Sequence, residues 1–384
     1  MHILFLVYDY DPGKQLGGAS VYIEVMAQAW KNAGHQVSVI CRSTTQEKII
    51  LDHEGIRVVK VPLQKYPNAL LDKIKFRLYG DNSIRGIYMK EFSYAALKEV
   101  ETWDEKPNVI ESSADLCWAF VKDKRIPVMV RIHGLSLLES QVDPENKHLK
   151  SKLIFEIEDY CSRNAPFVST MSQYMASIMK KNNITIKSFV HNPLPPIPPS
   201  LENISKIKKQ LVTVGRLVPR KRFDISIKVL AQLDAPWTLK VVGPDSQFGP
   251  EEKSYLEHLK ELSRTLNVED RVFFTGPLSR EDTLKAIAES EIMIHASPIE
   301  NMPYSIMEGL AIRTKVLACS EGGIPEILEG RGVMKTFDDI TGFADAIKNN
   351  QVFPISDKDH RQFMKEHDAS HIQQQLEDLY SHYK

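Results

Sequence analysis

The segment Glu300–Glu308 constrains the fold of this chain more than any other. Its sequence, Glu-Asn-Met-Pro-Tyr-Ser-Ile-Met-Glu, follows the short apolar run 292–297, and after Pro303 the pattern changes to helical spacing. A buried strand that leads through a loop into a helix is the repeating unit of a parallel α/β sheet. We therefore expect Glu300 in the loop at the carboxyl end of a strand and Glu308 within the helix that follows.

The same segment predicts a place for a phosphate group. The first N–H groups of a helix have no partner within the helix, and here they lie near Tyr304 and Ser305. A carboxylate in the loop, free amides, and a second carboxylate about two turns further on suit a sugar, a diphosphate and a ribose in that order.

Length and composition indicate the class of protein. A chain of 384 residues is too long for one core and predicts two domains of ordinary size. With 42% apolar and 26% charged residues and a net charge of −1, we expect a soluble globular protein with no overall preference for nucleic acid. The charge is uneven, because the stretch from Arg57 to Lys98 holds nine Lys or Arg against three Asp or Glu.

The cysteines and the apolar runs indicate the compartment. Cys41, Cys117, Cys161 and Cys319 are scattered, which favours free thiols in a reducing compartment over a disulfide framework or a metal site. The apolar start Met1–Tyr8 is short and predicts a first strand, not a signal peptide. No run approaches the roughly 20 apolar residues of a membrane span. We therefore expect a cytoplasmic protein.

Strand-like and helix-like patterns alternate through both halves of the chain. In the first half we expect strands at 3–7, 37–40, 58–61, 108–110, 128–132 and 167–169 and helices at 20–33, 151–163 and 173–181. In the second half we expect strands at 211–214, 239–242, 272–274, 292–297 and 315–318 and helices at 201–209, 222–233, 250–265, 280–289, 324–328 and 357–384. This βαβ rhythm predicts two doubly wound parallel sheets.

Two details mark the limits of these elements. In the first helix, Ser20 is the expected N-cap and Gly34 the C-terminal stop. The segment from Asn192 to Ser200 contains five prolines, so it predicts a stiff, extended linker between the domains.

Loops at the carboxyl ends of other strands carry residues that suit an anion. Arg216 and Lys221 follow Gly215 between a strand and a helix, where both cations could reach a diphosphate, although such a loop is often only a solvated surface. Gly17-Gly18 lets the backbone approach an anion closely, or simply makes a tight turn. His133 ends a strand and is either a ligand or catalytic group, or structural. Neither G-x-G-x-x-G nor a Walker loop is present.

Taken in order, these motifs resemble those of the family 4 retaining glycosyltransferases of the GT-B fold. The resemblance covers most of the chain and rests on Gly17-Gly18, Arg131–Gly134, Val190–Pro193, Val214–Lys221, Val241–Gly243, Phe274–Gly276 and Glu300–Glu308. It implies two Rossmann-like domains facing each other across a cleft. Residues 1–193 would bind the acceptor and residues 194–384 the nucleotide sugar, with the last helix, about 365–384, crossing back to the N-terminal domain.

The resemblance also implies roles for individual residues. The donor would be a UDP- or GDP-sugar, and no cofactor or metal ion would be needed. The catalytic residues would be His133, Arg216, Lys221 and Glu300. The donor would be bound by Gly17, Gly18, Gly215, Gly243, Pro277, Met302, Pro303, Tyr304, Ser305 and Glu308. Within this set Glu308 would hold the ribose and Glu300 the transferred sugar, and the anomeric configuration would be retained.

Two departures from the usual pattern bear on specificity. Asn301-Met302-Pro303 stands where the family often has a Gly-Phe-Gly-type run, which leaves the sugar open. Arg222 replaces the small residue that commonly follows Lys221. The residues also leave two other functions open. One is a non-catalytic sugar-nucleotide-binding protein, and the other is a different GT-B enzyme such as a sugar-nucleotide epimerase or a phosphorylase.

The basic stretch points to the acceptor. Apolar and basic side chains interleave there in the residues Leu70, Leu71, Lys73, Ile74, Lys75, Phe76, Arg77 and Leu78. Such a segment could be a basic amphipathic helix on anionic lipid, or a solvated helix over the core. We therefore expect a glycan or lipid-linked acceptor in bacterial cell-envelope polysaccharide or glycolipid synthesis, with peripheral contact at the inner face of the membrane.

Overall fold

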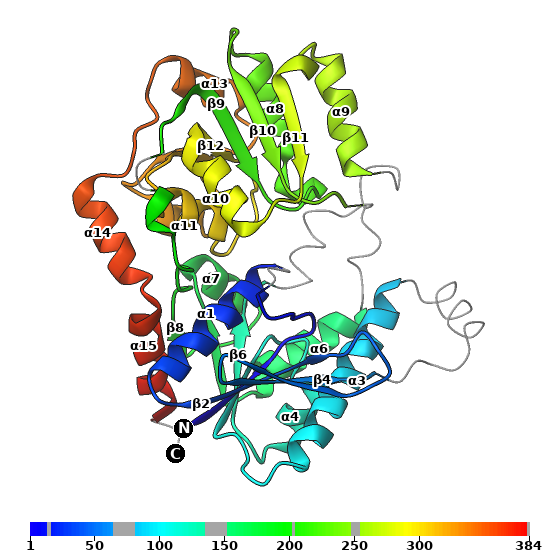
Figure 1. Cartoon of the computed structure of the whole chain (residues 1–384). Coiled ribbons are helices and arrows are strands. Elements are labelled where there is room, and N and C mark those ends of the chain that lie inside the picture. Colours follow the sequence, from blue (N-terminus) through cyan, green and yellow to red (C-terminus); the bar gives the residue numbers. More distant parts are fainter. Residues whose placement is uncertain (14–16, 64–80, 135–151, 202–203, 247–253, 382–384) are drawn as a thin grey trace. The chain divides into compact units, whose positions relative to one another are not determined.

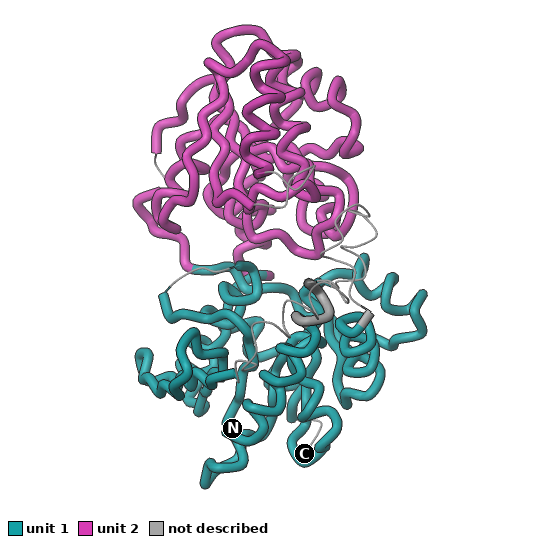
Figure 2. Tube along the Cα trace, turned by 90° about the vertical axis from the view of Figure 1, so that its right-hand side faces the viewer, with its two compact units in different colours: residues 1–195, 367–384 teal, residues 196–366 magenta. Residues whose placement is uncertain are grey.

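Two sheets, one mostly parallel and one wholly parallel, organise the chain (Figure 1). The computed structural model describes residues 1–13, 17–63, 81–134, 152–201, 204–246 and 254–381. The chain divides into two compact units, one of residues 1–195 and 367–384 and the other of residues 196–366 (Figure 2).

The first unit contains an eight-stranded sheet in the order β3-β4-β2-β1-β5-β6-β7-β8, in which β3 pairs antiparallel to β4 and the other pairs are parallel. Its strands are β1 (His2–Leu6), β2 (Gln36–Arg42), β3 (Ile49–His53), β4 (Ile56–Val61), β5 (Val109–Ser112), β6 (Val128–Ile132), β7 (Phe167–Thr170) and β8 (Ser188–Phe189). Its helices include α1 (Gly18–Asn32), α3 (Asp81–Glu101), α4 (Trp118–Asp123), α6 (Lys152–Asn164), α7 (Gln173–Lys181) and α15 (Ala369–Ser381).

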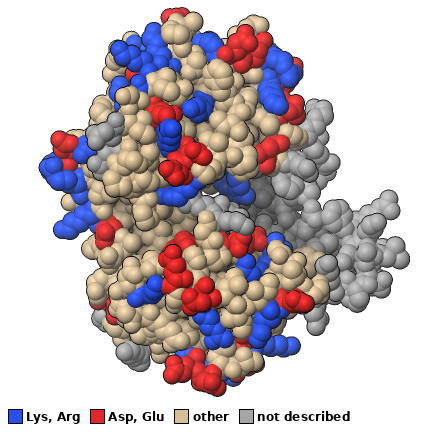
Figure 3. Space-filling model, in the orientation of Figure 1, with Lys and Arg blue, Asp and Glu red and all other residues tan. Residues whose placement is uncertain are grey.

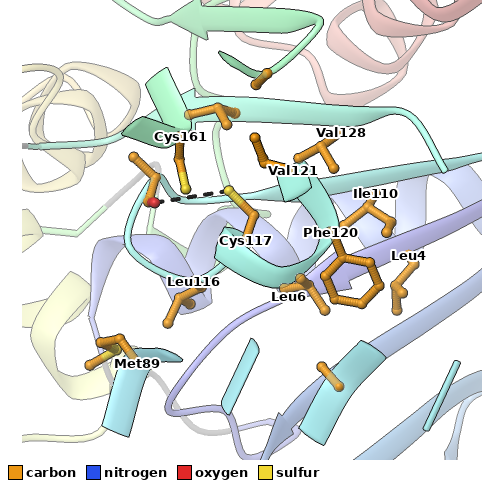
Figure 4. Close-up of a cluster of buried hydrophobic side chains, with 14 of the residues drawn as sticks. Leu4, Leu6, Met89, Ile110, Leu116, Cys117, Phe120, Val121, Val128 and Cys161 are labelled. Carbon is orange, nitrogen blue, oxygen red and sulfur yellow. Dashed lines mark hydrogen bonds between the residues drawn. The ribbon is translucent and has the colours of Figure 1, made fainter. Parts of the chain in front are cut away.

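A large apolar core lies between this sheet and the helices α3, α4 and α6 (Figure 4). Leu4 and Ile110 contribute from the sheet, and Phe120 and Cys161 contribute from α4 and α6. Because helices cover the sheet on both faces, its central strands are mostly apolar, apart from residues such as Glu111 and Arg131, and β1, β5, β6 and β7 are buried along their whole length. Each fully buried large side chain contributes about 1.5–3 kcal/mol.

The second unit contains a six-stranded, wholly parallel sheet in the order β11-β10-β9-β12-β13-β14. Its strands are β9 (Ile207–Val214), β10 (Thr238–Val242), β11 (Val272–Gly276), β12 (Ser290–His295), β13 (Lys315–Cys319) and β14 (Val333–Lys335). Its helices are α8 (Phe223–Ala231), α9 (Tyr255–Thr265), α10 (Arg280–Glu289), α11 (Tyr304–Ala311), α12 (Ile324–Leu328), α13 (Ile340–Lys348) and α14 (Asp357–Glu366).

The strand order of the second sheet creates a switch point. The first strand, β9, lies between β10 and β12, so the chain builds the sheet outward from β9 in both directions. In such a sheet the loops that follow the two strands at the switch diverge and leave a crevice at the carboxyl edge. The prediction of doubly wound sheets is confirmed, and the loops after β9 and β12 are the two that leave the sheet at the switch point.

Two local predictions were wrong. The expected helix at 201–209 is not formed, because Pro199–Leu201 makes a short 3₁₀ turn and the residues from Ile207 onward already pair within the sheet as β9. Ser20 is not the N-cap, because α1 begins at Gly18. The Ser20 hydroxyl instead donates to the carbonyl oxygen of Gly17 at 2.8 Å, from within the first turn.

The surface of each unit carries charges of both signs. Lys and Arg are interspersed with Asp and Glu on the face that Figure 3 shows, in keeping with the net charge of −1. None of the helices in the described part of the chain has the length and apolar character that crossing a bilayer requires. The expected basic amphipathic segment, from Leu70 to Leu78, lies outside the described residues.

The core makes a direct prediction about stability. Phe92 on α3 is fully buried, and its ring packs edge-on against Tyr8 with the ring centroids 5.6 Å apart. Tyr94 on the same helix is 46% exposed. Replacing Phe92 with Ala should lower the free energy of unfolding by about 3–5 kcal/mol, because it removes the ring's burial and leaves a cavity. Tyr94→Ala is the matched control and should change it by less than about 1 kcal/mol. Urea unfolding followed by circular dichroism measures both, and equal effects would contradict the assigned core.

Candidate active site

The loops after β9 and β12 meet through a buried ion pair. The Lys221 ammonium donates to Glu300 Oε1, and the two side chains are 17% and 10% exposed. Lys221 ends a short 3₁₀ turn, Pro219–Lys221, that follows β9, and Glu300 lies in the loop after β12. The structure thus brings together two of the residues that the sequence singled out, at the switch point of the sheet.

Burial and pairing act in opposite directions on this pair. Burial opposes the charge of Glu300, but the surrounding groups, led by Lys221 and His295, together outweigh it and hold the pKa of the carboxyl well below its ordinary value. Burial lowers the pKa of Lys221, and Glu300 opposes that shift. Glu300 is therefore an ionised acceptor with a cation beside it, which suits hydrogen bonds from hydroxyl groups.

The backbone of Glu300 is fixed by a glycine turn. The N–H of Gly323 donates to the carbonyl oxygen of Glu300 at 2.7 Å. At Gly322, whose φ is +72°, a Cβ atom would lie only 2.6 Å from the same oxygen. A side chain at Gly322 would therefore displace the loop that carries Glu300.

His295 lies beneath the same carboxylate and was not predicted from the sequence. Its Nε2 is 3.7 Å from Glu300 Oε1, and its Nδ1 is 3.4 Å from the hydroxyl of Ser305. The side chain is buried at the end of β12, and burial lowers its pKa although Glu300 opposes that shift. A neutral imidazole therefore stands between the carboxylate and the start of α11.

The start of α11 offers peptide N–H groups to an anion. Pro303 occupies the N-cap position, and no side chain caps this end of the helix. Tyr304 and Ser305 are the first two residues of the helix. Backbone N–H groups at these positions take no part in the helical hydrogen bonds. Such a helix start, next to a strand's carboxyl end, favours a phosphate or carboxylate.

The second carboxylate has a different environment. Glu308 is buried on α11, and its Oε1 is 2.5 Å from a guanidinium nitrogen of Arg280, the first residue of α10. Burial raises the pKa of Glu308, and Arg280 opposes that shift. Arg280 was not among the predicted site residues, because nothing in the local pattern shows that α10 lies beside α11.

The other predicted residues of this unit lie in the neighbouring loops. Gly215 and Arg216 follow β9, and Gly215 donates its N–H to Val242 at the end of β10. Gly243 packs so closely that an added Cβ atom would lie 1.8 Å from the carbonyl oxygen of Gly215. Gly243 therefore shapes the loop that carries Arg216.

Two further predicted donor-binding residues differ in exposure. Met302 is buried in the loop before α11, at 6% exposure. Pro277 is exposed between β11 and α10.

In the first unit, the predicted residues lie at the start of α1 and directly after β6. Gly17 is the N-cap of α1, Gly18 is the first residue of that helix, and His133 follows β6. The ring of Tyr22 meets His133 edge-on, with ring centroids 5.0 Å apart. Burial, and then the charge of Arg131, lower the pKa of His133 to about 3, so this imidazole is neutral at physiological pH.

A buried polar cluster lies beneath His133. The Tyr22 hydroxyl donates to Glu111 Oε1 at 2.5 Å, and the Tyr380 hydroxyl of α15 donates to Glu111 Oε2 at 2.6 Å. The Arg131 guanidinium lies 4.3 Å from the centre of the Tyr22 ring. The last helix, α15, thus contributes Tyr380 to the polar cluster that holds Tyr22, and the ring of Tyr22 contacts His133.

The ion pair makes a prediction about stability. Lys221→Met should lower the free energy of unfolding by about 3–5 kcal/mol, because it leaves the Glu300 charge buried without its cation. The double variant Lys221→Met/Glu300→Leu should recover most of that loss, since no unpaired charge remains. Lys260→Met, which breaks an exposed pair with Glu257, should cost less than about 1 kcal/mol. Urea unfolding distinguishes these outcomes, and a double variant less stable than Lys221→Met would contradict them.

Comparison with known proteins gives the family. Residues 17–186 match the family described as glycosyl transferase 4-like domain, and residues 201–366 match the family described as glycosyl transferases group 1. Mannosylfructose-phosphate synthase of Agrobacterium fabrum is 20% identical over 337 residues, which are 80% of this chain and 72% of that protein.

Two solved structures share the fold over nearly the whole chain. Sucrose-phosphate synthase from Thermosynechococcus elongatus has a TM-score of 0.77 at 19% identity and covers 99% of this chain and 98% of its own. HepE of Anabaena, in complex with UDP-glucose, has a TM-score of 0.71 at 20% identity over 100% of both chains. The two family matches together cover most of the chain, and with this fold they show that the chain belongs to the family 4 glycosyltransferases of the GT-B fold.

Proposed function

We propose that this protein transfers a sugar from a UDP- or GDP-sugar to a hydroxyl of a glycan or lipid-linked acceptor, with retention of the anomeric configuration and without a metal ion. Family membership supplies glycosyl transfer as the reaction class. The buried pair of Lys221 and Glu300, next to the uncapped start of α11, is the observation that carries the finer assignment.

The main electrostatic requirement of this reaction is to stabilise the negative charge of the leaving diphosphate. As the bond from the anomeric carbon to the diphosphate oxygen breaks, negative charge grows on the leaving group. Arg216 and Lys221, together with the N–H groups of Tyr304 and Ser305, would stabilise that charge. These protein cations take the part that a metal ion plays in other transferases.

The remaining groups would orient the donor and acceptor. Glu300 would accept hydrogen bonds from hydroxyls of the transferred sugar, and Glu308 would accept them from the ribose. The acceptor hydroxyl would attack from the face that the diphosphate leaves, and its proton would pass to the departing phosphate oxygen. His133, being neutral, would serve as a hydrogen-bonding group for the sugar and not as a cation.

Diphosphate release tests the assignment of the reaction. Purified protein with UDP-glucose or GDP-mannose should release the nucleoside diphosphate faster when a suitable acceptor is added. An epimerase would interconvert the sugar without any acceptor, and a non-catalytic binding protein would bind the donor without release. UDP-glucose is a reasonable first donor because the HepE structure contains it.

The cations of the β9 loop provide a sharper test. Arg216→Gln should lower the turnover number by on the order of 10²-fold, because one group that stabilises the leaving diphosphate is lost. Lys260→Gln, on the exposed face of α9, is the control and should retain full turnover. Unchanged turnover in Arg216→Gln, in protein with an unaltered melting temperature, would remove Arg216 from the mechanism.

The excess of lysine and arginine between Arg57 and Lys98 supports peripheral contact with an anionic membrane at its cytoplasmic face. The full-length protein should float with vesicles that contain phosphatidylglycerol at low salt, and not with vesicles of phosphatidylcholine alone. Binding should weaken as salt increases, because the attraction is screened. Absence of flotation with phosphatidylglycerol vesicles at low salt would exclude this contact and leave the transferase assignment intact.

A further inference from the structure

Arg280 joins three separate parts of the second unit. Its side chain starts from the first residue of α10 and reaches Glu308 on α11, where Nη1 lies 2.5 Å from Oε1. Its Nη2 donates to the carbonyl oxygen of Pro196, the first residue of this unit, at 3.1 Å. The guanidinium is thus held at both ends, by a carboxylate and by a backbone carbonyl.

Both partners of the ion pair are largely removed from water. The side chain of Glu308 is 10% exposed and that of Arg280 is 24% exposed. Breaking such a pair leaves the remaining carboxylate poorly solvated, so its orientation and charge both depend on the guanidinium. The planar fork of arginine fixes the direction of the contact in a way that a single ammonium does not.

The contact leaves Glu308 able to bind a ligand. A carboxylate has about four acceptor positions on its two oxygens, and Arg280 contacts Oε1. The remaining positions can accept two neighbouring hydroxyl groups, which is the pattern that a ribose presents.

Other charged groups near α11 act elsewhere. His360 on α14 contacts the carbonyl oxygen of Ala311 at the far end of α11, at 2.9 Å. Lys315 on β13 pairs with Glu291. Among the described residues, Arg280 is the charged group that acts on the pKa of Glu308.

We propose that Arg280 is a positioning residue for nucleotide recognition, which holds Glu308 in the orientation that binds the ribose hydroxyls. The inference rests on the proposed function, which places the ribose at Glu308. Arg280 itself does not contact the reacting atoms. It fixes a carboxylate that would otherwise be free to rotate and to take up a proton in its buried position.

Calorimetric titration of the full-length protein tests this role. The ligands are UDP and GDP, followed by the 2′,3′-dideoxy form of whichever one binds. Arg280→Gln should weaken binding of the intact nucleotide by about tenfold or more, and should change binding of the dideoxy form little. Glu308→Gln should remove the same discrimination, and Arg280→Lys should restore part of it. Lys285→Gln, an exposed residue of the same helix, is the control without effect.

The pH dependence gives a second readout that a purely structural role would not move. Burial already raises the pKa of Glu308 and Arg280 opposes it, so removing Arg280 should raise that pKa further. Glu308 must be ionised to bind ribose. As the pH is lowered, a carboxyl group with a raised pKa takes up its proton, and stops binding ribose, at a higher pH. The pH at which nucleotide affinity falls by half should therefore move upward in Arg280→Gln, and should be unchanged in Lys285→Gln.

The outcomes separate this inference from the function on which it rests. If the wild-type protein binds neither nucleotide, the proposed function fails and the role of Arg280 fails with it. If the wild type binds and Glu308→Gln weakens binding but Arg280→Gln does not, only the role of Arg280 is overturned. Equal weakening of the intact and dideoxy nucleotides in Arg280→Gln, without a pH shift, would also overturn it.

Discussion

The order of the strands in the second sheet determines the candidate site. Because β9 lies between β10 and β12, the loops that follow β9 and β12 leave adjacent strands at the same edge of the sheet. Lys221 and Glu300, 79 positions apart in the sequence, therefore meet in a buried ion pair. Such a pair adds little net stability, since the loss of hydration offsets the attraction. Its presence at the switch point is better explained by a binding role than by stability, because proteins depart from the most stable packing mainly at functional sites.

The strands of both sheets are largely predictable from the sequence, because most of them contain a short run of buried apolar residues. The runs that became β6 and β12 could be recognised without any knowledge of their neighbours. The edge strand β3 was missed, since its residues are largely exposed and lack such a run. The residues 207–209, which begin β9, are predicted as helix for a similar reason, because they are exposed and include two lysines.

The site was predictable only where it is local in the sequence. Glu300, Glu308 and the start of α11 lie within one strand–loop–helix unit, so their spacing alone indicates a shared site. His295 and Arg280 were missed because their importance comes from neighbours in space. His295 ends a strand whose pattern predicts only burial, and Arg280 faces Glu308 because α10 and α11 lie side by side, which depends on the strand order.

The pKa values of the two carboxyl groups in this segment, Glu300 and Glu308, are shifted in opposite directions. Burial acts against the charge of both. At Glu300 the surrounding groups, led by Lys221, together outweigh it and the pKa falls, whereas at Glu308 Arg280 offsets it only in part and the pKa rises. Glu300 is thus held in the ionised state. At Glu308 burial is opposed by a single guanidinium, and that guanidinium comes from Arg280, a residue outside the motif.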